Sequence, residues 1–420
     1  MTTDPILAAR EIAPALSAAK LRGAGAVFAT TFGSFVSVTP AIVAVLGVYL
    51  KPIAEEFGWS RAAVAGALAA CALSNALACP FAGKLADRIG PRKTALIGNV
   101  LLALSLLLIS QVPANLSLYY LGFVIAGAVG AMPSILVFAK ILSEWFDRTR
   151  GFWLGFSSGV GNGGGAFLFP MFAAAILASH GWRQGFLADG AFVLLAGFPV
   201  MYLFLREPPA RIAQQNKEPL PLEGMTYREA MRSPLFWWIF SILPLGAGCM
   251  TAMFSTIVPL LTDRGVSIDS AVMAIQAFAL TTMFVEPGSG WLADRTSSPK
   301  IIAPLFLTAA VGLWMLLHVH SEALILLAGA LIGVGAGVEF TGIPYLLSRY
   351  FGLKEFGAIA GVAFAGTLLF GALAPLFLNA VFDRFGSYDA AVYTIIGILI
   401  YSGVALLTFG PYRYTAAHHG

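Results

Sequence analysis

Charged residues are scarce in this sequence, and their scarcity excludes an ordinary soluble protein. Asp, Glu, Lys and Arg make up 11% of the 420 residues, whereas a soluble domain carries about 25%. The mean hydropathy is +0.83, and apolar runs of about 20 residues, each long enough to cross a bilayer, recur along the chain. We therefore expect a membrane protein, and we interpret the net charge of +4 as a consequence of topology and not of nucleic-acid binding.

Cysteine is equally scarce, and motifs for catalysis are absent. The three cysteines, Cys71, Cys79 and Cys249, all lie in apolar runs, which argues against a disulfide framework. The sequence has no HExxH motif, no Cys and His residues at metal-ligand spacing and no nucleophile motif. We therefore expect no enzyme, no metal and no cofactor. The glycine-rich stretch 159–165 lacks the Gly-Lys-Ser/Thr ending of a phosphate-binding loop and instead indicates close helix packing.

The apolar runs predict an all-α membrane protein with twelve transmembrane helices in two six-helix bundles, because helices satisfy their own backbone hydrogen bonds in lipid. The first six helices are expected at 24–50, 60–83, 94–112, 116–141, 151–178 and 185–205, and the second six at 235–261, 270–291, 301–319, 322–347, 356–381 and 388–410. The corresponding domains are an N-terminal tail (1–23), a first bundle (24–205), a linker (206–233), a second bundle (234–411) and a C-terminal tail (412–420). Asp4 and Glu11 precede a first run that is too long for a signal peptide, so we expect no cleavable one.

Lysine and arginine are distributed unequally between the two sides of this topology. Of the 25 Lys and Arg residues, 20 fall on the side that holds both tails and the linker, and five fall on the other side. Because positively charged loops tend to stay in the cytoplasm, we expect both termini to be cytoplasmic. The sequence thus predicts a multi-pass protein of the cell (plasma or inner) membrane.

Two short charged loops carry related sequences. GKLADRIGPRK (83–93) joins helices 2 and 3, and GWLADRTSSPK (290–300) joins helices 8 and 9, 207 residues later. WFDRTRGFWLG (145–155) and YFGLKEFGAIAG (350–361) form a second pair at a shift of 205 to 206 residues. We interpret the chain as two pseudo-symmetric halves, which in a duplicated bundle usually enclose a substrate site near the middle of the bilayer.

GKLADRIGPRK resembles the loop 2–3 signature of the major facilitator superfamily, and a degenerate second copy is also typical of that family. The resemblance implies that Asp87 contacts the start of helix 11, near residues 355–361, where an electropositive helix end favours an anion. It also implies that Arg88 reaches Glu144 or Asp147, and that such contacts hold the cytoplasmic side shut until the halves rock apart. The expected gate residues are Asp87, Arg88, Arg92, Glu144, Asp147, Glu286, Asp294 and Arg295.

Further stretches narrow the resemblance to one branch. LKPIAEEFGWSRAAV (50–64), WFDRTRGFWLGFSSGVGNGGG (145–165), HGWRQGF (180–186), YREAMRSPLFWW (227–238) and SRYFGLKEFGAIAG (348–361) are similar to the bacterial monocarboxylate and oxalate–formate transporters. Drug/proton antiporters have an arginine in helix 4 and a Gly-Pro pair in helix 5, where this chain has Phe123 and Gly163-Gly164, which disfavours efflux by that route. Helices 8 and 11 lack the internal base of many carboxylate carriers, which argues against a small dicarboxylate.

Ionisable groups inside the membrane are costly, and each is a functional candidate by default. Glu339 lies ten residues before Arg349, hence roughly 15 Å from the end of helix 10. Burial favours the protonated form that a proton carrier needs, and the alternative is a structural acid bonded to a neighbouring helix. Glu286, two turns before Asp294, is expected at the gate. Lys140 is expected to extend to water, with attraction of an anion as the alternative.

Neutral polar residues at mid-helix form the candidate substrate site, although helix–helix hydrogen bonding is an alternative role for each: Ser37, Asn162, Thr251, Ser255, Gln276 and Tyr345. We predict a monomeric secondary transporter that works by alternating access, and we favour uptake of a monocarboxylate or other organic acid with protons. Efflux of hydrophobic drug-like compounds and uptake of a neutral nutrient such as a vitamin are the alternatives. A non-transporting membrane sensor is a more remote one. The expected partners are this substrate, protons and the lipid bilayer.

Overall fold

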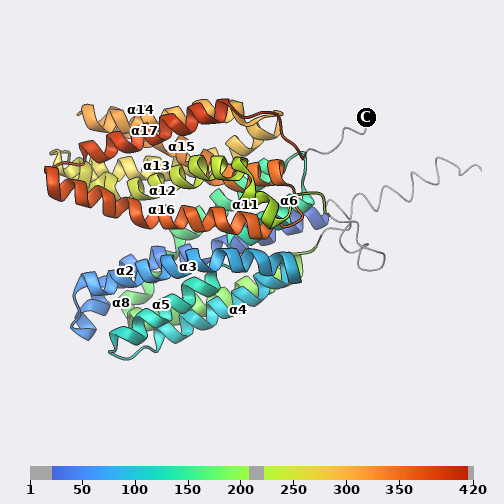
Figure 1. Cartoon of the computed structure of the whole chain (residues 1–420). Coiled ribbons are helices and arrows are strands. Elements are labelled where there is room, and N and C mark those ends of the chain that lie inside the picture. The colour runs from blue at the N-terminus through green and yellow to red at the C-terminus, as the bar shows by residue number, and fades with distance from the viewer. Residues whose placement is uncertain (1–20, 208–221, 415–420) are drawn as a thin grey trace, which may run out of the picture.

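The computed structural model of the chain describes residues 21–207 and 222–414, which are almost entirely helical (Figure 1). The first half contains Leu21–Phe57, whose last part is α2 (Val45–Phe57), then α3 (Arg61–Ile89), α4 (Pro91–Ser110), α5 (Leu116–Gly130), α6 (Ile135–Trp145), α7 (Arg150–Phe156), α8 (Gly164–Phe192) and α9 (Phe198–Phe204). The second half contains α12 (Pro234–Asp263), α13 (Ile268–Asp294), α14 (Ala303–His318), α15 (Glu322–Phe351), α16 (Phe356–Phe385) and α17 (Asp389–Leu407). Residues 1–20, 208–221 and 415–420, and with them most of the predicted tails and linker, lie outside the described residues.

Eleven of the described helical segments are long and apolar enough to cross a membrane. One of them, Arg150–Phe204, has 55 residues. At 1.5 Å per residue this is about 80 Å of helix, far more than one crossing needs. The segment is interrupted at Gly181, whose φ of 81° is not helical and favours glycine. It therefore supplies two crossings, and the predicted twelve-helix architecture is confirmed.

Local sequence signals set where the helices begin and end. Ser60 and Asn115 cap α3 and α5 by accepting the backbone N–H groups of Ala63 and Leu118, each at 3.1 Å, as N-cap side chains do. Gly58, in the left-handed conformation with φ 67°, follows the last residue of α2. Short capped turns therefore reverse the chain between successive spans. The span that contains α7 and the first part of α8 is less regular, because the glycine-rich stretch Ser157–Gly163 (η2) between them is π-helical.

Within residues 21–207 and 222–414, buried apolar side chains form three clusters, and their distribution shows how the halves meet. One cluster lies within the first half, around Tyr49 and Phe186, and another lies within the second half, around Met253. The third contains side chains of both halves at the end of the molecule that carries the loops 83–93 and 290–300, which we call the basic end. The halves are thus packed together at the basic end, while each has its own core toward the opposite end.

The last part of the predicted linker is folded onto the second half. Its helix α11 (Tyr227–Arg232) begins where the N–H of Tyr227 donates to the Glu355 carboxylate at 2.6 Å. Just before it, the N–H of Met225 donates to the carbonyl of Phe351 at 2.8 Å. α11 packs against α12 and α16, and Figure 1 shows it at the basic end. These bonds fix the end of the linker next to the loop that joins α15 and α16.

We expect the basic end to face the cytoplasm, and single cysteines test this. Ser117, near the start of α5, and Ser297, after the end of α13, lie at opposite ends of the spans, and both are exposed. In intact cells, a cysteine at position 117 of a cysteine-free protein should react with an impermeant thiol reagent. One at position 297 should react only after lysis. The reverse pattern would show that the basic end faces outward.

Candidate functional site

A carboxylate at the end of α3 joins the two halves at the basic end. Asp87 accepts the backbone N–H of Gly357 on Oδ1 at 3.0 Å and that of Ala358 on Oδ2 at 2.8 Å. These N–H groups belong to the first turn of α16, where they have no partner within the helix and where the helix dipole favours an anion. The contact that the resemblance implies for Asp87 is therefore present.

The two helices approach this closely because neither has a side chain at the point of contact. A Cβ on Gly83 would overlap the carbonyl oxygen of Gly357, and a Cβ on Gly357 would overlap the carbonyl oxygen of Gly83. The backbones of α3 and α16 are thus in direct contact one turn from Asp87. This crossing positions the carboxylate on the first turn of α16.

The second charged loop repeats this arrangement in the opposite direction. Asp294, the last residue of α13, accepts the N–H groups of Gly151 at 2.9 Å and Phe152 at 3.0 Å in the first turn of α7. Gly290 and Gly151 again meet without side chains. Each half therefore places one aspartate on a helix start of the other half. We call these two contacts the Asp87 latch and the Asp294 latch.

Two arginines strengthen the junction between the latches. Arg349 Nη1 lies 2.7 Å and Arg150 Nη2 lies 3.0 Å from Asp147 Oδ1, and Arg150 Nη1 donates to the hydroxyl of Ser348 at 3.0 Å. Both arginines are buried, and because Arg349 and Ser348 belong to the second half, the network crosses between the halves. Neither arginine was expected at the gate, although both stand in or beside the repeated segments 145–155 and 350–361.

The expected contact between Arg88 and Asp147 is replaced by contacts of Asp147 with two other arginines. Arg88 is exposed, and the carboxylate of Asp147, which Arg88 was expected to reach, is bound instead by Arg150 and Arg349. The reason is geometric, because these two arginines lie at the ends of α7 and α15 that face Asp147. A contact between Arg88 and Glu144, at the end of α6, stays a prediction.

Two other expected gate residues contact their own half. Arg92 donates to the carbonyl of Tyr202 at 2.8 Å. The guanidinium of Arg295 lies over the ring of Trp291, with Cζ 3.8 Å from the ring centroid. Both contacts stabilise the loops that carry the latches, and neither crosses between the halves.

Lys140 differs from the expectation that it extends to water. Its side chain is 1% exposed, and its ammonium group is bound to Oδ1 of Asp87. A buried ammonium group needs a counter-ion, and here the latch carboxylate supplies it. Lys140 is therefore part of the Asp87 latch.

The six residues expected to bind substrate occupy three different places. Ser37 and Asn162 lie in the first half, where η1 (Thr39–Ala44) packs against η2. Thr251, Ser255 and Gln276 lie on α12 and α13 of the second half, and all three are exposed. The hydroxyl groups of Thr251 and Ser255 donate to carbonyls of their own helix at 2.9 and 2.8 Å, so they need no partner on another helix. Tyr345 lies elsewhere, at the basic end.

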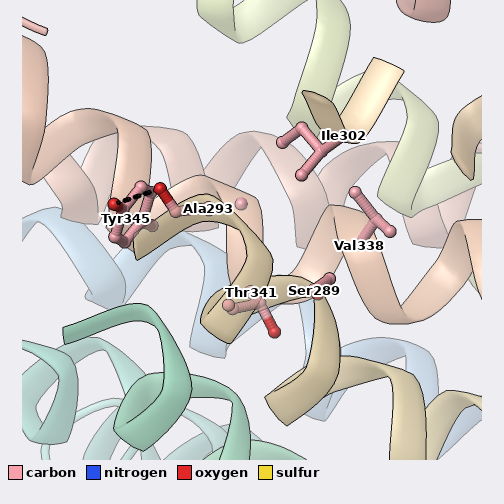
Figure 2. A pocket seen from close by; sticks show the side chains of 8 residues that line it. Ser289, Ala293, Ile302, Val338, Thr341 and Tyr345 are labelled. Atoms are coloured by element: carbon pink, nitrogen blue, oxygen red, sulfur yellow. Dashed lines mark hydrogen bonds between the residues drawn. The ribbon is translucent and has the colours of Figure 1, made fainter. Parts of the chain in front are cut away.

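Tyr345 borders a small cavity inside the second half, shown in Figure 2. The cavity has a volume of about 10 Å³ and is lined by Ser289, Gly290, Ala293, Ile302, Val338, Thr341, Gly342 and Tyr345. The Tyr345 hydroxyl donates to the carbonyl of Ala293 at 3.0 Å. A volume of about 10–15 Å³ holds one water molecule, so this cavity is too small for an organic solute, and the position of Tyr345 indicates a structural bond near the Asp294 latch.

Two buried carboxyl groups of the second half differ in their surroundings. Glu339 on α15 is 0% exposed, lies against Gly246 of α12, and neither of its oxygens has a hydrogen-bond partner among the described residues. Glu286 on α13 is also buried, but it faces the first half, because its backbone meets Gly155 of α7 and the hydroxyl of Ser158 is its hydrogen-bond partner. Glu286 therefore lies on the seam between the halves, whereas Glu339 lies inside one half.

A third buried carboxyl group was not identified from the sequence. Asp189 on α8 is 4% exposed, and among the described residues its Oδ2 and the nearby hydroxyl of Tyr49 have no hydrogen-bond partner. The signal that could have identified it is an acid inside the apolar run 185–205. It lies in the first half, in the region where that half has its own core.

Comparison with known proteins agrees with this architecture. The family model of the Major Facilitator Superfamily matches residues 24–375 and 250–419. Human monocarboxylate transporter 11 is 26% identical, covering 85% of this chain and 77% of that protein. The probable nitrate/nitrite transporter NarK2 of Mycobacterium tuberculosis is 27% identical, covering 87% of this chain and 89% of that protein.

A solved structure shares the fold. The fucose:proton symporter FucP of Escherichia coli superimposes with a TM-score of 0.70 at 13% sequence identity, over 91% of this chain and 97% of that chain. Together with the paired latches, these findings define a membrane transporter and not an enzyme. The chain belongs to the Major Facilitator Superfamily.

The glycine contact at the Asp87 latch gives a direct test of its role. Gly83→Val should lower transport by about tenfold or more, because overpacking of a close contact costs roughly 1–3 kcal/mol and here forces α3 away from α16. Uptake into proteoliposomes measures this effect. The matched control is Gly397→Ala on α17, where a Cβ meets nothing within 4 Å and uptake should be unchanged. Full activity of Gly83→Val would contradict the role of this contact in closure.

Proposed function

We propose that this chain takes up an organic acid with an apolar body, such as a monocarboxylate, together with protons, by alternating access in the cell membrane. The observation that carries the mechanism is that two-fold-related latches close the basic end while each half keeps a separate core toward the opposite end. We assign the basic end and both termini to the cytoplasm and expect the protein to act as a monomer. The similarity to a monocarboxylate transporter and a nitrate/nitrite transporter supports an anionic substrate.

Neutral polar groups are the proposed partners of the substrate carboxylate. Ser37 and Asn162 in the first half and Thr251, Ser255 and Gln276 in the second half offer hydroxyl and amide groups. Lys140 is not available to an anion in this conformation, because its ammonium group is bound to Asp87. If no cationic side chain balances the charge of the substrate carboxylate, a proton transported with the substrate can balance it. This agrees with proton-coupled uptake.

Glu339 is the proposed proton carrier. A buried carboxylate without a partner is costly in its charged form, so a proton on Glu339 stabilises the packing of α15 against α12 at Gly246. Loss of the proton disfavours that packing, and in this way release of the proton is coupled to a rearrangement of the second half. Asp87, Asp294 and Glu286 are the proposed gate residues, since all three lie at contacts between the halves.

Uptake of a neutral nutrient is the second candidate, and one observation favours it. The described part of α13 contains no lysine or arginine, and α16 contains only Arg384, near its last residue. A pathway without a free base suits a neutral solute. Counterflow in proteoliposomes with labelled monocarboxylates, dicarboxylates, vitamins and apolar drug-like compounds decides between the candidates, because only a true substrate exchanges against its own gradient.

The role of Glu339 as proton carrier is tested by comparing a variant of Glu339 with a variant of Glu286. Glu339→Gln should abolish uphill uptake driven by a pH gradient but keep exchange of substrate for substrate, because Gln keeps the shape of the protonated acid and cannot release a proton. Glu286→Gln changes the other buried acid of the second half, which lies at a contact between the halves. It should slow both modes together but keep the level of pH-driven accumulation. Both modes are measured in the same proteoliposomes. Retained uphill uptake in Glu339→Gln would falsify the assignment, and its loss in Glu286→Gln alone would transfer the role to Glu286.

A further inference from the structure

Among the described residues, Asp87 forms an ion pair within its own half, and no ion pair is described for Asp294. Asp87 Oδ1 accepts both the N–H of Gly357 in the second half and a hydrogen bond from Lys140 in its own half. Lys140 lies on α6 and is 1% exposed, and Asp87 is 11% exposed. One carboxylate therefore joins a buried lysine of the first half to a helix start of the second half.

The internal repeat shows what stands at the equivalent positions of the Asp294 latch. The repeated segments are offset by 205 to 206 residues, and a shift of 205 takes Lys140 to Tyr345. The hydroxyl of Tyr345 donates to the carbonyl of Ala293, the residue before Asp294, at 3.0 Å. At these equivalent positions, the first half thus has an ammonium group bound to the latch aspartate itself, and the second half has a neutral hydroxyl bound to the backbone beside the latch aspartate.

The two helix starts that the aspartates contact carry opposite charges, a cation at the start of α7 and an acid before α16. The same shift of 205 takes Arg150, the first residue of α7, to Glu355, which precedes α16. Asp294 therefore meets a helix start that carries a cation, and Arg349 is a second cation near it. Asp87 meets a helix start that carries an acid, whose side chain accepts the N–H of Tyr227. The described ion pair of Asp87 is with Lys140.

We propose that Lys140 is the permanent counter-ion of Asp87 and positions its carboxylate for the latch. When the halves separate at the basic end, Gly357 and Ala358 leave with the second half, whereas Lys140 stays because it belongs to the first half. Asp87 then keeps its ion-pair partner in its own half and can bind the helix start again when the halves close. Without Lys140, the carboxylate of Asp87 would lose its ion-pair partner and would no longer be held in position for the N–H groups in the first turn of α16.

Because Lys140 and Asp87 form a buried pair, a single substitution at either residue both changes the latch and leaves the other charge without its partner. Asp87→Asn removes the anion and leaves the ammonium group of Lys140 buried without a counter-ion, which is more damaging than loss of the whole pair. Lys140→Met leaves the carboxylate of Asp87 without its cation. The double variant removes both charges. The inference rests on the gating role proposed for Asp87, but its stability consequence does not depend on the substrate.

The test is a double-mutant cycle with two readouts on purified full-length protein. The melting temperature reports the buried pair. The reaction rate of the native Cys79 with a small thiol reagent reports opening of the basic end, since Cys79 is 3% exposed on α3 where it meets Gly361 of α16. The background is Cys71→Ser/Cys249→Ser.

Lys140→Met and Asp87→Asn should each lower the melting temperature and raise the Cys79 rate by about tenfold or more. Asp87→Asn/Lys140→Met should melt above both single variants but keep the fast Cys79 rate, because the pair is gone and so is the latch. Lys140→Arg should restore the slow rate, whereas Lys140→Tyr, which copies the other latch, should behave like Lys140→Met.

Three results would overturn the proposal. They are additive losses of melting temperature in the double variant, a normal Cys79 rate in Lys140→Met, and a normal rate in Lys140→Tyr, which would show that a hydrogen bond without charge is sufficient. None of these depends on whether the substrate is an organic acid, so a failure of the proposed substrate class is separate and is seen only in the counterflow panel.

Discussion

The contact of a carboxylate with the first turn of a helix in the opposite half is the interaction on which this conformation depends. The N–H groups of a first helical turn lack partners inside the helix, and an aspartate satisfies two of them at once while it meets the positive end of the helix dipole. The contact occurs twice, at Asp87 and Asp294, and each requires a crossing of glycines. Because it consists of a few polar bonds, it can be made and broken without unfolding either half.

The packing of the interior also allows the halves to separate without unfolding. Each half has a cluster of buried apolar side chains of its own, and one cluster at the basic end is shared. A half that keeps its own core can move as a rigid body, whereas the shared cluster must open when the latches release. The network of Asp147, Arg150 and Arg349 lies at this shared end, so charge and apolar packing close the same surface.

Three buried carboxyl groups differ in what surrounds them, and this difference decides what each can do. Glu339 is enclosed within the second half against Gly246, Glu286 lies on the seam beside α7 and Ser158, and Asp189 lies beside Tyr49 in the first half. A charge in any of these places is costly, but only at Glu286 does the cost change directly when the halves separate. Glu339 responds through the packing of its own half.

The sequence by itself determined the membrane class, the twelve spans and the duplication, because hydropathy and internal repeats are properties of neighbouring residues along the chain. The repeat also identified Asp87 and Asp294, and the resemblance placed Asp87 at the start of the span that the structure has as α16. Only the tertiary structure decided the partners, because these come from residues far apart in the chain. In the structure, Lys140 binds Asp87 and does not extend to water. Arg150 and Arg349 bind Asp147, which was expected to bind Arg88. Tyr345 borders a cavity the size of one water molecule. A side chain's partner depends on which helix faces it, and no local pattern specifies that.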